Sequence, residues 1–143
     1  MSYNLLQFSS FGELLRYIDA QIESLQKSVE SLHQRYESVK ARAERMRALE
    51  RVLEDLLGEK LPALNEIDYM GLRVVVNARA VDELAVLEET LESQRETLES
   101  LIRVRELIER LGGSLEQAGG GGIVVLVQTL NGVPLRILLK EVE

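Results

Sequence analysis

The sequence predicts a mainly α-helical fold: a long antiparallel two-helix coiled-coil hairpin, with a short β element between the helices and a β-hairpin near the C-terminus. Three observations support this fold class. Apolar residues recur at alternating steps of three and four through two long segments. Basic residues collect in the first of these segments and acidic residues in the second. The last part of the chain consists of two apolar runs around Asn131-Gly132, a dipeptide typical of hairpin turns.

The first helix is expected over residues 10–58. Ser10 and Glu13 match a capping box, with Ser10 as the N-cap residue, and Gly58 and Pro62 are expected to end the helix. The apolar stripe of this segment contains Leu15, Ile18, Ile22, Leu25, Val29, Leu32, Tyr36, Val39, Ala43, Met46, Leu53 and Leu57. A helix of this length with one apolar stripe is not stable alone, so it requires a partner helix.

The second helix, over residues 79–111, is the expected partner, with Gly112-Gly113 as its end. Residues 35–51 contain six basic and three acidic residues, whereas residues 82–99 contain seven acidic residues and one basic residue. An antiparallel hairpin places these segments side by side, but a parallel homodimer would place each acidic block against its own copy. The alternative is that both charged blocks are simply solvated faces.

The segment between the helices predicts a β element over residues 67–77. It contains Leu72, Val74, Val75 and Val76, with a possible tight turn at Met70-Gly71 and Asn77 as a candidate cap of the second helix. Strands cannot satisfy their own backbone groups. We therefore expect Leu72, Val74, Val75 and Val76 to take part in oligomerisation.

The chain divides into a helical hairpin at 1–113, a Gly-rich tether at 114–122 and a β-hairpin at 123–142. A two-residue turn at Asn131-Gly132 pairs Leu130 with Val133. Continued in the same register, it pairs Gln128 with Leu135, Leu126 with Ile137 and Val124 with Leu139, which makes one face almost wholly apolar. Pro134 indicates a strand at a sheet edge.

This hairpin needs a surface to pack against, because a lone hairpin is marginally stable. One possibility is local. If the second helix returns directly from the end of the first, the start of the first helix is left uncovered, and the apolar face of the hairpin can pack on it. The uncovered residues would be Phe11, Leu14, Leu15, Ile18 and Ile22. The other possibility is a sheet with the 72–76 strand of another subunit. The sequence leaves both open.

No group of residues in the sequence indicates catalysis. The net charge of −7 and the pI near 4.9 disfavour nucleic-acid binding. There is no cysteine, His33 is the single histidine, and the glycines at 119–122 lack the Lys-Ser/Thr of a phosphate loop. No apolar run approaches the ~20 residues that cross a bilayer. We therefore expect a cytoplasmic, non-catalytic protein without cofactor, metal or small-molecule substrate.

Residues 67–101, "IDYMGLRVVVNARAVDELAVLEETLESQRETLESL", resemble the β-type subunits of prefoldin in their order of a strand and an acidic, leucine-rich helix. The resemblance implies an antiparallel coiled coil, oligomers joined through the inter-helix β segments, and an ATP-independent holdase that grips unfolded clients. Prefoldin subunits end in their second helix, whereas this chain adds the tether and the hairpin.

The expected function is therefore that of a homo- or hetero-oligomeric, prefoldin-like chaperone subunit whose partners are proteins. The alternative is a structural or adaptor coiled coil that binds one specific protein through its C-terminal hairpin by sheet addition. The candidate client- or partner-binding residues are Leu5, Leu6, Phe8, Phe11, Val124, Leu126, Leu135 and Ile137.

Overall fold

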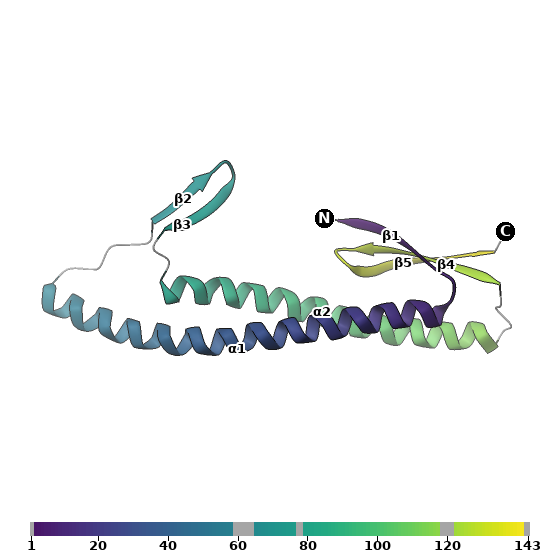
Figure 1. The fold of residues 1–143 in the computed structure, drawn as a ribbon, viewed down its shortest axis with the longest axis horizontal. Helices are drawn as coiled ribbons and strands as arrows, with labels where there is room; N and C mark the ends of the chain where they lie inside the picture. The colour runs from purple at the N-terminus through teal and green to yellow at the C-terminus, as the bar shows by residue number, and fades with distance from the viewer. Residues whose placement is uncertain (1, 59–64, 77–78, 118–121, 142–143) are drawn as a thin grey trace. The chain divides into compact units, whose positions relative to one another are not determined.

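The computed structural model describes residues 2–58, 65–76, 79–117 and 122–141 (Figure 1). Its elements are β1 (Tyr3–Phe8), α1 (Phe11–Leu57), β2 (Asn65–Tyr69), β3 (Leu72–Val76), α2 (Ala80–Gln117), β4 (Ile123–Leu130) and β5 (Val133–Glu141). They form two compact units. Unit 1 contains Met1–Val29 and Ser93–Glu143, and unit 2 contains Glu30–Glu92. Both long helices contribute to each unit.

The two helices pack against each other in antiparallel orientation, as predicted. In unit 1, Arg105 of α2 donates to the carboxylate of Asp19 of α1, and the Ser28 hydroxyl donates to the Gln94 side chain over 2.9 Å. In unit 2, the Tyr36 hydroxyl donates to Glu88 over 3.1 Å. Residue numbers rise along α1 while those of their partners fall along α2. The antiparallel hairpin is thereby confirmed.

The start of α1 uses Ser10 as its cap. The Ser10 hydroxyl accepts the N–H of Glu13 over 3.1 Å. The Glu13 carboxylate does not complete the predicted capping box on Ser10. It accepts the backbone N–H of Ser9 over 3.0 Å and also the Ser9 hydroxyl. These bonds lower the pKa of Glu13, and the bond from the Ser9 hydroxyl is the largest cause.

The predicted overhang at the start of the first helix is wrong. Phe11, the first residue of α1, lies against Gly112 of α2, where an added Cβ would be 3.0 Å from the Phe11 Cβ. The prediction assumed that α2 begins beside the end of α1. Residues 58–79 lie between the helices, and Arg79, just before α2, reaches back to Glu50 with an N–O distance of 3.6 Å. This shift covers the start of α1.

The second helix also continues beyond its predicted end. It passes through Gly112 and Gly113 and ends at Gln117, so residues 114–117 of the predicted tether are helical. Gly112 is buried, and it permits the close approach of α2 to Phe11. Tertiary packing thus outweighs the cost of about 1 kcal/mol that each glycine imposes on a helix.

A three-stranded antiparallel sheet in the order β1-β4-β5 forms the other layer of unit 1. Strand β1, which we did not predict, pairs with β4 from Tyr3–Leu130 to Phe8–Val125. One face of the sheet packs on both helices of the same chain. The buried core cluster consists of Phe8, Leu14, Ile18, Ile22, Leu101, Ile108, Val125 and Val127.

The β4–β5 hairpin has the predicted turn but a different register. Asn131 and Gly132 have φ angles of 52° and 85°, as a type I′ turn requires, and Leu130 pairs with Val133. The register then shifts, so that Leu135 is the extra residue of a β-bulge. The observed pairs are Gln128–Arg136, Leu126–Leu138 and Val124–Lys140, and the three predicted pairs beyond the turn are wrong by one residue.

The buried face of β4 is also the opposite of the predicted one. Val125, Val127 and Thr129 are buried, whereas Val124 and Leu126 are only half-buried. Residues 123–127 are all apolar, so their alternation contains no information about which face turns inward. The pairing with β1 and the helices beneath select the face.

In unit 2, β2 and β3 form a separate two-stranded sheet, paired from Asn65–Val76 to Tyr69–Leu72. Met70 and Gly71 have φ angles of 51° and 91°, in agreement with the predicted tight turn. The predicted cap Asn77 lies outside the described residues. At the start of α2, the Asp82 carboxylate instead accepts the backbone N–H of Arg79 over 2.9 Å.

Candidate functional site

Four of the predicted binding residues belong to the core of unit 1. Phe8 is 7% exposed, and Leu6, Phe11 and Ile137 are partly buried and pack against the same core cluster. Their apolar surface stabilises the contact between sheet and helices. The expectation that they grip a partner stays a prediction, and their packing in the fold does not favour it.

The other four predicted residues lie outside the core cluster. Leu5 of β1 and Leu135 at the bulge of β5 are well exposed, whereas Val124 and Leu126 of β4 are half-buried. Leu5 pairs with Gln128, so it lies on the face of the sheet that carries Leu126 and not on the face of Val125 and Val127. This outer face remains available for binding.

Strand β5 is an open edge of this sheet. Among the strands that the structure describes, in the order β1-β4-β5, β5 has one neighbour, β4. Leu138 and Leu139 point to opposite faces and are 47% and 44% exposed. Sequence reasoning placed neither residue at a binding site. The signal that could have found them was Pro134, which indicated an edge strand.

The two ends of β5 differ in their capacity to accept another strand. Near the turn, Pro134 lacks an N–H group and the bulge at Leu135 interrupts the regular pairing. From Arg136 to Glu141 the pairing with β4 is regular. The part of the edge that can accept a further strand is therefore 136–141.

A groove of about 360 Å³ lies on the outer face of the sheet, beside this edge. It is lined by Tyr3, Asn4, Leu5, Gln128, Arg136 and Leu138. An exposed aromatic ring, two leucines, two amides and one guanidinium can receive a side chain from a strand that lies along β5. The groove thus adds a possible source of specificity to the backbone pairing.

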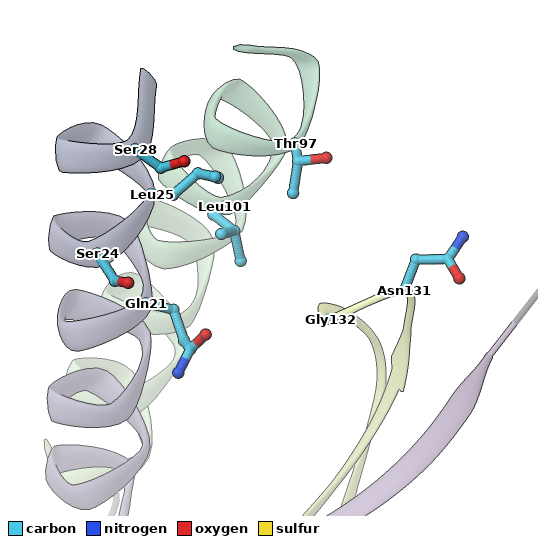
Figure 2. Close-up of a pocket in the computed structure, with 8 residues that line it drawn as sticks. All are labelled: Gln21, Ser24, Leu25, Ser28, Thr97, Leu101, Asn131 and Gly132. Carbon is cyan, nitrogen blue, oxygen red and sulfur yellow. The ribbon is translucent and has the colours of Figure 1, made fainter. Parts of the chain in front are cut away.

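A second groove, of about 300 Å³, lies between the helices and the β4–β5 turn (Figure 2). Its lining is mostly polar: Gln21, Ser24, Ser28, Thr97 and Asn131 accompany Leu25 and Leu101. The turn is held in place by Asn131, whose side chain accepts the Ser2 N–H over 3.0 Å and whose own N–H donates to the Ser2 carbonyl over 2.8 Å.

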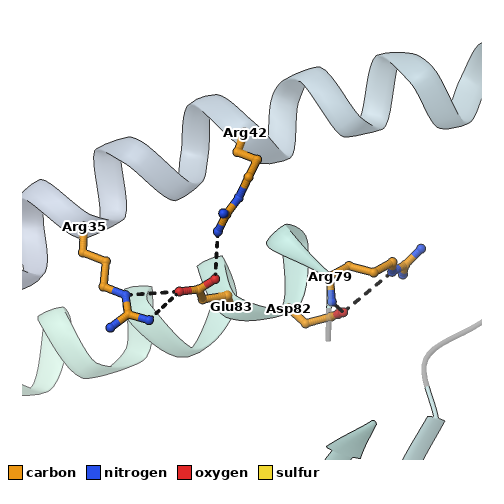
Figure 3. A network of polar contacts seen from close by, with 5 residues as sticks. All are labelled: Arg35, Arg42, Arg79, Asp82 and Glu83. Carbon is orange, nitrogen blue, oxygen red and sulfur yellow. Dashed lines mark hydrogen bonds and ion pairs between the residues drawn. The ribbon is translucent and has the colours of Figure 1, made fainter. Parts of the chain in front are cut away.

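In unit 2, basic side chains of α1 pair with acidic side chains of α2, as the charge pattern predicted, and the centre of these contacts is the Glu83 carboxylate (Figure 3). Glu83 accepts from Arg35 over 2.8 Å and from Arg42 over 3.1 Å. Arg79 adds an ion pair with Asp82 at 3.7 Å. The bonds from Arg35 and Arg42 to Glu83 attach the first turns of α2 to α1, whereas the Arg79–Asp82 pair lies within the start of α2. Nearby, the hydrogen bond to Glu88 raises the pKa of Tyr36.

The α1 segment beyond this network carries exposed apolar side chains. We call Met46, Leu49, Val52, Leu53 and Leu56 the α1 stripe; all five are exposed. Of the predicted oligomerisation residues, Leu72 is 65% exposed, and the side chains of Val74, Val75 and Val76 lie outside the described part of the chain.

Within the described residues, no group of three or more His, Cys, Asp and Glu side chains could hold a metal ion. None of the described helices has the length and apolarity needed to span a membrane. Comparison with protein-family models, curated proteins and solved structures finds no match to this chain.

Proposed function

We propose that this protein is a non-catalytic adaptor that binds a protein partner by strand addition along residues 136–141 of β5. The observation that supports this function best is the pair Leu138 and Leu139, exposed on the two faces of an edge strand. Strand β4 and the helices packed against the sheet support this edge. A cytoplasmic location is part of the proposal, because a chain without cysteine does not depend on an oxidising compartment.

The physical basis is the unpaired backbone at the sheet edge. Alternate N–H and C=O groups of an edge strand lack a partner strand, and an extended peptide satisfies them while its side chains enter neighbouring pockets. A peptide beside β5 would cover Leu139 on the inner face and Leu138 on the outer face. The groove next to Leu138 and Arg136 would receive one of its side chains.

The test is selection of extended peptides from a random displayed library on the full-length protein, followed by affinity measurements with purified peptides. Leu138→Lys and Leu139→Lys are expected to weaken binding of the selected peptides at least tenfold, because a lysine on an edge strand opposes further pairing. Leu107→Lys is the matched control: Leu107 is also exposed in unit 1, but it lies on α2.

Three results would contradict the proposal: no peptide is enriched, selected peptides bind the β5 variants unchanged, or Leu107→Lys weakens binding equally. Deletion of the C-terminal hairpin is not a suitable test. Val125 and Val127 belong to the core cluster, so the deletion would expose Phe8, Leu14 and Ile18 as well as remove β5.

A prefoldin-like holdase is a second candidate. The observation that favours it is the β2–β3 hairpin between two antiparallel helices, which is the arrangement that the resemblance of residues 67–101 implies. The tip of this hairpin exposes Tyr69 and Met70. A holdase should suppress aggregation of a heat-denatured client without nucleotide, as measured by light scattering, and Met70→Lys should reduce this protection.

A further inference from the structure

The coiled-coil seam of α1 extends beyond the helix that covers it. Val39 and Ala43 are 3% and 1% exposed, whereas Met46 and Leu53, which continue the same spacing, are 44% and 47% exposed. The α1 stripe is therefore the direct continuation of an interface that is already formed. We infer that the α1 stripe binds the same stripe of a second copy of this chain, in antiparallel orientation.

The charges along the stripe select the orientation. Residues 42–49 contain three arginines and one glutamate, and residues 50–57 contain three acidic residues and one arginine. Two copies in antiparallel orientation place the basic half of one segment against the acidic half of the other. A parallel pair would place like halves together. Charge complementarity thus favours a second copy, and it favours one direction.

Two residues illustrate the complementarity. Val39, Ala43, Met46, Glu50 and Leu53 occupy the seam positions of the heptad repeat, and in this frame Arg47 and Glu54 occupy equivalent flanking positions, one heptad apart. Equivalent flanking positions face each other across an antiparallel pair, so Arg47 of one copy lies beside Glu54 of the other, twice in each dimer. Such flanking charges determine orientation in coiled coils.

The chain's own contacts cover this seam at Glu50 and leave its apolar side chains exposed beyond that residue. Glu50, the polar residue at a seam position, meets Arg79 at the start of α2. Beyond it, Leu53 and Leu56 have large exposed fractions, 47% and 78%. The stripe is short, so the interface belongs to the small, weakly associating class, and we expect a dissociation constant on the order of 10 µM.

Sedimentation velocity on the full chain over a range of concentrations tests the association. Wild type is expected to form a dimer, and Leu53→Lys to weaken it more than tenfold. Leu107→Lys, an exposed leucine on α2, is expected to leave it unchanged. A wild type that stays monomeric well above the expected constant would overturn the inference, and so would a dimer that Leu53→Lys does not weaken.

A charge exchange tests the orientation. Arg47→Glu is expected to weaken the antiparallel dimer about 5- to 10-fold, because two exposed ion pairs become repulsions. The double variant Arg47→Glu/Glu54→Arg recreates both pairs with exchanged signs, so its affinity should return to within about twofold of wild type. Failure of the double variant to recover would contradict the antiparallel pairing.

Cysteine cross-linking gives an independent measurement, because the natural chain has no cysteine. In the antiparallel pair the two copies of residue 56 lie roughly 15 Å apart along the helices, so oxidised Leu56→Cys protein should not cross-link with itself. An equimolar mixture of Leu49→Cys and Leu56→Cys proteins should form the mixed disulfide. Self-cross-linking of Leu56→Cys would show a parallel pair and overturn the inference.

Discussion

The contact between Gly112 and Phe11 gives the sharpest test of the helix register. Gly112 and Gly113 are adjacent within α2, but their surroundings differ. A Cβ added to Gly112 would lie 3.0 Å from the Phe11 Cβ and 3.1 Å from its Cγ, whereas a Cβ added to Gly113 would meet nothing within 4 Å. Gly112→Ala and Gly113→Ala are thus a matched pair that differs only in this contact.

The magnitudes follow from two opposing effects. Replacing a glycine inside a helix by alanine adds about 0.5–1 kcal/mol of stability, so Gly113→Ala should increase the free energy of unfolding by this amount. Gly112→Ala has the same gain, but overpacking costs about 1–3 kcal/mol. Phe11 cannot relieve the contact by a side-chain rotation, because its Cβ is the nearest atom. We expect a net loss of about 0.5–2 kcal/mol.

Urea unfolding followed by far-ultraviolet circular dichroism measures both variants, and equal m-values show that the two unfolding transitions are comparable. The informative quantity is the difference between the two alanine variants, which should be about 1–3 kcal/mol in favour of Gly113→Ala. If Gly112→Ala is as stable as Gly113→Ala, the start of α1 does not lie against residue 112, and the register described above is wrong.

Three further perturbations address the charge network, the helix cap and the hairpin turn. In urea unfolding, Glu83→Gln should lower the free energy of unfolding by about 0.5–1 kcal/mol, and by less at high salt. The exposed control Glu89→Gln should show no loss. The pKa of Glu13 is lowered from its ordinary value of 4.5 in the folded state, so its stabilising effect is present above that value and is lost as the pH falls through the lower folded pKa. Thermal unfolding across this acid range should therefore be less pH-dependent in Glu13→Gln than in wild type. Asn131→Ala should cost about 1–2 kcal/mol, because alanine is strained at a positive φ and cannot accept the Ser2 N–H, whereas Asn131→Gly should lose less.

The helices and their direction could be predicted because their signals are redundant. The apolar spacing is sustained over many turns, and the charge blocks distinguish antiparallel from parallel pairing without any knowledge of the turn. The axial register could not be predicted in the same way. It depends on where α2 begins beside α1, and local sequence patterns give no such distance. A tight connection was assumed, so the uncovered part of the first helix was expected at Phe11–Ile22, whereas the exposed apolar side chains lie at Met46–Leu56.

The sheet shows where local patterns are insufficient. Asn131-Gly132 was recognisable because few dipeptides accept two positive φ angles. At Met70-Gly71 the signal was the glycine that precedes the apolar run 72–76. The bulge at Leu135 has no comparable signature, and it shifted every pair beyond it. Residues 3–8 were interpreted as a binding segment because their strand partner lies at the other end of the sequence. In a two-stranded hairpin the second edge of β4 would have no partner strand, and this could have suggested that a third strand pairs with it.

The apolar residues that the sequence offered as binding candidates are only in part those that the structure leaves exposed. Apolar side chains on strands were expected to bind a partner, yet Phe8, Phe11 and Ile137 stabilise the chain's own fold. The exposed edge residues Leu138 and Leu139 were not singled out. Burial is a property of the assembled layers, so residue type alone could not separate apolar side chains of the core from those of a binding surface.

The pairing of β1 with β4 has a consequence for how the chain is made. Strand β1 leaves the ribosome more than a hundred residues before the strand with which it pairs, Val125 to Leu130. The helices can form from local contacts during synthesis, but this pairing joins residues far apart in the sequence and cannot form until β4 has been made. Until then Phe8 and Leu14 lack the strand that covers them, so the growing chain passes through a period in which it is most prone to aggregate.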